Sequence, residues 1–89
     1  MGDPVTALKI PTVHLNGTSK AALVEQLDHA VGALNAALRA LYDAQPNARD
    51  YYTQGPDAIN EALADHRSRL ERVQIVRNEI VAIWEGLEP

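Results

Sequence analysis

The sequence contains no cysteine and no phenylalanine, and its 89 residues include only one tryptophan and three tyrosines. Without cysteine, the chain can form neither a disulfide nor a thiolate-based catalytic or zinc site. With aromatic residues at only 4%, its interior has to be built from leucine, valine, isoleucine and alanine. A single domain this small buries only a modest fraction of its own surface. Stability therefore has to come from economical packing or from a core that is shared with another chain.

Positive charge and long apolar runs are also scarce. The net charge is −4, whereas proteins that bind duplex nucleic acid need a surplus of lysine and arginine along the phosphates. No stretch approaches the ~20 apolar residues that span a bilayer, and the N-terminal segment does not have the composition of a signal peptide. We therefore expect neither duplex nucleic acid nor a membrane as a partner, and a cytoplasmic location.

Motifs typical of catalysis and metal binding are missing as well. The three histidines, His14, His29 and His66, do not have the spacing of a helical metal-ligand pair. There is no glycine-rich phosphate loop, nucleophile elbow or paired-acid constellation. We therefore expect a protein that is not an enzyme, with no metal and no cofactor. His66 falls on an apolar helix face, where a hydrogen-bonded core or interface histidine is favoured over a ligand.

Two long amphipathic stretches, residues 18–45 and 56–87, make up most of the chain. In the first stretch Leu27, Leu34 and Leu41 recur every seven residues, and a second apolar series lies beside them. These apolar faces are wider than one partner helix covers. The sequence therefore predicts an all-α fold, an antiparallel two-helix hairpin that assembles into a helical-bundle homo-oligomer.

The second stretch carries its own apolar seam. One position in the middle of this seam could be filled by either Val76 or Arg77. The other expected seam residues are Ile59, Leu63, His66, Leu70, Val73, Ile80, Trp84 and Leu87.

Proline and glycine mark the ends of these stretches. Residues 1–17 contain Pro4, Pro11 and Gly17, which predicts an extended arm rather than a helix. Thr18 or Ser19 can cap the first helix. The arm is thus followed by a hairpin domain, residues 18–89, whose connecting loop is expected at 46–55.

The expected loop, PNARDYYTQG, holds the densest cluster of functional groups in the chain. Tyrosine rings can stack on a base, and the fork of Arg49 can pair with a phosphate. The alternative is structural: one tyrosine packs on the end of the bundle, and Arg49 pairs with Asp50 or Asp57. Because Tyr51 and Tyr52 are adjacent, they cannot easily both be buried.

Two segments, PTVHLNGTS at residues 11–19 and PNARDYYTQG at residues 46–55, resemble small proteins encoded by tailed bacteriophages. The likeness covers residues 11–87. The shape, a short arm followed by a helical hairpin, is also similar to phage anti-defence sponge proteins of the anti-CBASS and anti-Thoeris types. This similarity in architecture implies an oligomer that sequesters a nucleotide-derived immune signal without hydrolysing it.

Two hypotheses from different classes follow. In the first, the chain binds a nucleotide-like anion: the loop tyrosines stack on it, Arg49 with Arg67 or Lys20 binds phosphate, and polar groups of the arm add further contacts. The residues of this candidate site are Arg49, Tyr51, Tyr52, His14, Asn16, Thr18, Lys20 and Arg67. In the second, the chain is a protein interaction or assembly factor without a small-molecule ligand, and the loop only caps the bundle.

Overall fold

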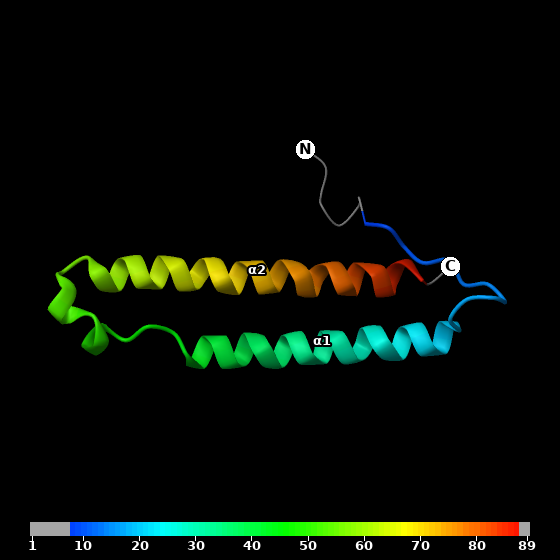
Figure 1. Ribbon diagram of the computed structural model, residues 1–89, viewed down its shortest axis with the longest axis horizontal. Coiled ribbons are helices and arrows are strands. Elements are labelled where there is room, and N and C mark those ends of the chain that lie inside the picture. Colours follow the sequence, from blue (N-terminus) through cyan, green and yellow to red (C-terminus); the bar gives the residue numbers. More distant parts are fainter. Residues whose placement is uncertain (1–7, 88–89) are drawn as a thin grey trace.

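The computed structural model, which describes residues 8–87, is a hairpin of two antiparallel helices (Figure 1). Helix α1 spans Lys20–Asp43 and helix α2 spans Ala58–Gly86. Two short 3₁₀ turns connect them, η2 at Ala48–Asp50 and η3 at Tyr52–Gln54. No residue between 8 and 87 belongs to a strand. The predicted all-α hairpin is confirmed for this part of the chain.

Helix α1 is shorter at both ends than the predicted 18–45. Ser19 keeps an extended conformation, and its side chain accepts a hydrogen bond from the backbone N–H of Ala22 at 3.1 Å. Ser19 rather than Thr18 is therefore the cap, and the helix begins at Lys20, two residues later than predicted. At the other end the N–H of Ala44 bonds back into the last turn. Pro46 disfavours helical geometry in the residue before it, so the helix ends at Asp43.

Helix α2 begins at Ala58 rather than at residue 56, because Gly55 redirects the chain just before it. Gly55 has a φ of 114° and a ψ of 165°, a conformation that is essentially restricted to glycine. Pro56 and Asp57 then form a turn, and the carbonyl of Asp57 accepts the N–H of Glu61 at 3.1 Å. The expected loop 46–55 therefore extends to residue 57 and consists mainly of the two 3₁₀ turns.

Polar contacts across the seam fix how the two helices pair. The side chain of Asn35 on α1 accepts a hydrogen bond from Nε of Arg77 on α2 at 2.9 Å. Arg77 is half-buried, whereas Val76 is 45% exposed. Of the two alternatives for the seam, Arg77 is therefore the residue that faces α1. Its long apolar stem packs in the seam while the guanidinium finds a polar partner.

His66 makes the second polar contact and has a structural role. It is buried, and its Nε2 lies 2.6 Å from the carbonyl oxygen of Leu41, so this ring nitrogen carries the hydrogen and donates it. Leu41 lies in the last turn of α1, where carbonyls have no regular partner within the helix. His66 thus caps α1 from the neighbouring helix, which confirms the expected hydrogen-bonded histidine.

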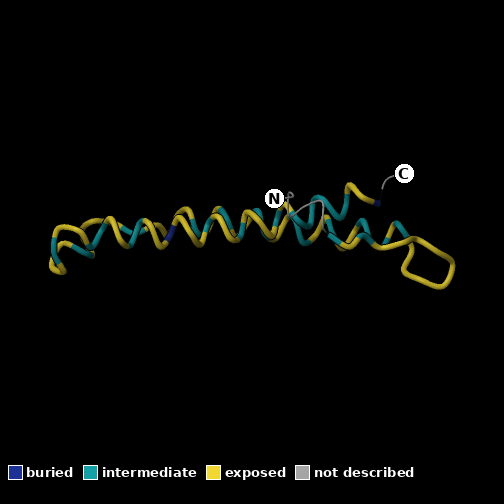
Figure 2. Tube along the Cα trace, turned by 90° about the horizontal axis from the view of Figure 1, so that it is seen from above, coloured by how far each residue is buried: buried dark blue, intermediate teal, exposed yellow. Residues whose placement is uncertain are grey.

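The core between the helices is thin. Among residues 8–87 only His66 and Leu87 are buried, and each keeps 6% of its surface exposed. Figure 2 shows most of both helices as half-buried on one side and exposed on the other. The two helices form a single layer, so each has one neighbour and leaves part of its apolar face in water.

The arm packs on the end of the hairpin opposite the loop, which we call the open end because no loop joins the two helices there. Residues 8–17 form no helix, as expected, and residues 1–7 of the predicted arm lie outside the described residues. The side chain of Ile10 packs on Gly86, where an added Cβ would fall 2.9 Å from it. Further along, the N–H of Gly17 donates to the carbonyl of His14 at 3.1 Å and closes a turn before α1. No helix in the described part of the chain is long and apolar enough to cross a membrane.

Candidate functional site

The eight residues of the predicted ligand site fall into two groups at opposite ends of the hairpin. Arg49, Tyr51 and Tyr52 lie in the 3₁₀ connection, with Arg67 on the neighbouring part of α2. The other four, His14, Asn16, Thr18 and Lys20, lie at the open end, in the arm and in the first turn of α1 (Figure 1). Helix α1 separates the groups by about 36 Å at 1.5 Å per residue. One chain therefore does not bring all eight residues together.

At the open end, the arm turns just before α1, and the N–H of Gly17 donates to the carbonyl of His14. The ring of His14 lies over Gly17, so that an added Cβ on this glycine would fall 2.8 Å from Nε2. His14, Asn16 and Thr18 are exposed, and Lys20 is half-buried. The arm thus turns into the Ser19 cap, and Lys20 is the first residue of α1.

At the loop end, the two tyrosines differ in exposure. Asn47 begins η2 by accepting the N–H of Arg49 on its side-chain oxygen at 2.9 Å. Tyr51 is half-buried, whereas Tyr52 is 77% exposed. Arg49 is exposed. One tyrosine thus packs down on the hairpin and the other extends into solvent.

Tyr51 borders a small polar hollow of about 210 Å³. This hollow is lined by the carboxylates of Glu61 and Asp65 and by a single guanidinium, that of Arg69. This balance is unfavourable for a phosphate-rich ligand, because the carboxylates repel it. Arg69 was missed in the sequence as a site residue, because it continues the fourfold spacing of Glu61 and Asp65 that is typical of a solvated helix face.

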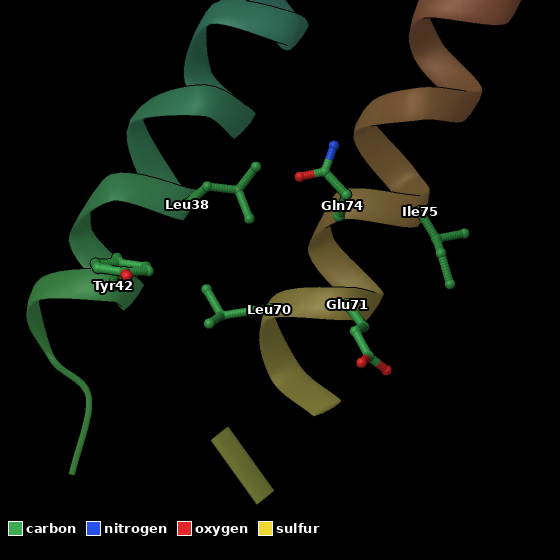
Figure 3. Close-up of a pocket in the computed structure, with 6 residues that line it drawn as sticks. All are labelled: Leu38, Tyr42, Leu70, Glu71, Gln74 and Ile75. Carbon is green, nitrogen blue, oxygen red and sulfur yellow. The ribbon is translucent and has the colours of Figure 1, made fainter. Parts of the chain in front are cut away.

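An apolar groove with a volume of about 600 Å³ lies between α1 and α2. Figure 3 shows Leu38 on α1 and Leu70 on α2 directed toward each other across it. Its exposed rim includes Tyr42, which is 64% exposed, and Ile75, which is 53% exposed. We call this hollow the central groove. Its lining residues are Leu38, Tyr42, Leu70, Glu71, Gln74 and Ile75.

A second hollow, of about 210 Å³, continues the central groove toward the loop end. It shares Tyr42 and Leu70 with the central groove, and it includes Arg67. Arg67 therefore lies on the loop side of Leu70, and Glu71 lies on the other side. Both charged residues are exposed. The two hollows thus form one continuous surface with an apolar centre and a charge of opposite sign on each flank.

The described residues place no group of three histidine, aspartate or glutamate side chains where it could hold a metal ion. No protein-family model matches the chain, and neither a curated protein nor a solved structure does so.

Proposed function

We propose that this chain is an assembly module, a helical hairpin that associates with copies of itself through the apolar surface that one copy leaves exposed. The observation that carries the proposal is the thin core. Most leucine, isoleucine and valine side chains along both helices are only half-buried, and Tyr42, Ile75 and Val76 are exposed by 64%, 53% and 45%. Contiguous apolar surface of this kind marks an interaction site.

The accessible surface of the chain supports the same proposal. It measures 6756 Å², whereas a compact monomer of 9.7 kDa exposes about 5,100 Å². The excess is about 1,600 Å², and a standard interface takes about 800 Å² from each partner. The mostly exposed arm contributes part of the excess. The half-buried helix faces contribute to it as well.

Unfolding at different protein concentrations tests this proposal. If association and folding are coupled, a hundredfold rise in protein concentration stabilises the folded state by about 2.7 kcal/mol. The urea midpoint should therefore rise with concentration, and sedimentation equilibrium should give a mass above that of one chain. A monomeric mass together with a midpoint that does not change with concentration would overturn the proposal.

A second function, sequestration of a nucleotide-derived immune signal by a phage-type anti-defence protein, has support from one geometric relation. In an antiparallel pair of hairpins, the loop end of one chain lies beside the open end of the other. The two separated groups of polar residues, including Tyr51 of one chain and Lys20 of its partner, would then approach each other. The acidic side chains around Tyr51 place this function second.

A thermal-shift screen tests this second function. The probes are cyclic di- and trinucleotides, ADP-ribose derivatives and mononucleotides. Because Tyr51 borders the polar hollow and Tyr52 does not, Tyr51→Ala should abolish a ligand-induced rise in melting temperature, and Tyr52→Ala should keep it. The ligand should be recovered intact. A flat screen with a folded oligomer, or equal losses in both variants, would reject sequestration at this hollow.

A further inference from the structure

The central groove and its continuation carry a charge pattern that is complementary to itself. Arg67 and Glu71 lie four residues apart on α2. Leu70, which lines both hollows, lies between them in the sequence. Residues four apart on a helix lie on the same face. A rotation of 180° about an axis that crosses α2 at right angles at the level of residue 69 exchanges the positions of Arg67 and Glu71.

We propose that this surface is the interface with a second copy of the chain, packed antiparallel about a two-fold axis that passes near Leu70. The proposal rests on the self-association proposed above and specifies its surface and symmetry. In this arrangement Arg67 of each chain faces Glu71 of the other, so the axis generates two identical ion pairs. A two-fold interface requires one patch that complements itself, and this patch has that property.

The apolar part of the groove fits the same axis. Leu70 lies one residue from the axis level, so the two copies of Leu70 and Tyr42 come together at the centre. Tyr42 and Ile75 are both part of the rim and exposed, so each chain offers side chains to fill the groove of the other. The result is an apolar centre with charged residues at the periphery, which is the usual composition of a protein interface.

A parallel pairing of the same faces has a different electrostatic outcome. It would place Arg67 beside its own copy and Glu71 beside its own copy, and like charges side by side disfavour association. The opposite charges on the two flanks therefore select the antiparallel arrangement. The same reasoning favours a second copy over an unrelated helix, because the groove already contains both halves of the complementary pattern.

Charge reversal at the two positions gives a direct test. In Arg67→Glu the two-fold brings four carboxylates together, and in Glu71→Arg it brings four cations together. Each variant alone should therefore dimerise about tenfold more weakly than the wild type, because two attractive pairs become repulsive. Arg72→Glu is the matched control for Arg67→Glu: it makes the same charge change at an exposed position of α2 that lines neither hollow.

Mixing the two variants separates the interface from effects within one helix. Arg67 and Glu71 also stand at i and i+4 in the same chain, so either variant places like charges on neighbouring turns of one helix. In a mixed dimer that contains one copy of each variant, however, both pairs across the axis have opposite charges. Native mass spectrometry should therefore show the mixed dimer in excess of the statistical proportion, and sedimentation should show dimer affinity restored toward that of the wild type.

Three outcomes would overturn the inference: a wild type that stays monomeric, charge-reversal variants that dimerise as well as Arg72→Glu, or a mixture with only the statistical share of mixed dimers. The last two outcomes with an oligomeric wild type would reject this surface and leave self-association standing. A monomeric wild type whose unfolding does not depend on concentration would reject both.

Discussion

His66 donates a hydrogen bond across the hairpin to the end of α1, and its removal should weaken the folded state by a definable amount. The perturbation is His66→Phe, which keeps an aromatic ring of similar shape and removes the donor. The bond from Nε2 to the carbonyl of Leu41 is 2.6 Å long, and the ring is buried. The variant therefore loses a short hydrogen bond at a site that water does not easily reach.

The expected magnitude follows from the environment of the carbonyl. A net hydrogen bond contributes about 1 kcal/mol, and a buried acceptor without any partner costs more. The carbonyl of Leu41 also accepts the N–H of Ala44 at 3.1 Å, so it does not become unpaired in the variant. The loss should therefore stay near 1 kcal/mol, which lowers the melting temperature of a domain this size by about 5 °C.

Thermal unfolding followed by circular dichroism at one fixed protein concentration measures this loss. His66→Gln is the matched control, because its side-chain amide can place an N–H near the position of Nε2. This variant should keep more stability than His66→Phe. If His66→Phe unfolds at the wild-type temperature, or if both variants lose stability equally, the histidine does not cap α1 through this bond.

Other substitutions test other parts of the fold. Gly32 and Gly55 both have open space where a Cβ would be added, yet replacing them by alanine should change stability in opposite directions. Gly32→Ala should raise stability by about 0.5–1 kcal/mol because Gly32 is helical, and Gly55→Ala should lower it by about 1–3 kcal/mol because of its positive φ. Thermal melts measure both changes, and changes of the same sign would contradict the reasoning. In a double-mutant cycle on Asn35→Ala and Arg77→Ala, urea unfolding should give a coupling of about 0.5–1.5 kcal/mol, and a value of zero would exclude the cross-helix bond. Among the described residues the buried indole N–H of Trp84 has no hydrogen-bond partner. Trp84→Phe should therefore lower the free energy of unfolding by less than about 1 kcal/mol in urea, since the lost ring area is offset by removal of an unsatisfied donor. A loss above about 3 kcal/mol would indicate that this N–H is bonded.

The helical hairpin could be predicted from the sequence because its determinants are local and periodic. The spacing of Leu27, Leu34 and Leu41 defines one face, and Pro46 and Gly55 interrupt the helical stretches. Helix ends were less predictable, because they depend on individual backbone conformations. Ser19 starts α1 only because its extended backbone points its hydroxyl at the N–H of Ala22.

The polar residues of the seam could not be assigned from periodicity alone. Val76 and Arg77 are neighbours in the sequence, and hydrophobicity favours Val76 as the inward residue. The structure places Arg77 inward because Asn35, 42 positions away, supplies an acceptor. Likewise, the apolar pattern predicted a hydrogen-bonded His66, but only the pairing of the two helices shows that its partner is the C-terminal turn of α1.

The candidate site was the least predictable part, because residue type indicates chemistry and gives no position. The tyrosines and Arg49 of the loop and the polar residues of the arm have suitable chemistry, but α1 holds them apart. The hollow with Arg69 forms where the loop lies against α2, and the central groove forms where α1 and α2 pair. For the groove, the width of the apolar faces was the one signal in the sequence.

The single-layer shape has a consequence for the hydrodynamic behaviour of the protein. The Cα radius of gyration is 18.3 Å and the longest extent is 61 Å, whereas a compact chain of 89 residues has a radius of gyration of about 12 Å. One copy should therefore elute from a gel-filtration column ahead of compact proteins of the same mass, and the elution volume alone would suggest a larger particle. Small-angle scattering separates mass from length: a side-by-side antiparallel pair doubles the forward intensity and changes the maximum dimension little, and an end-to-end pair nearly doubles both.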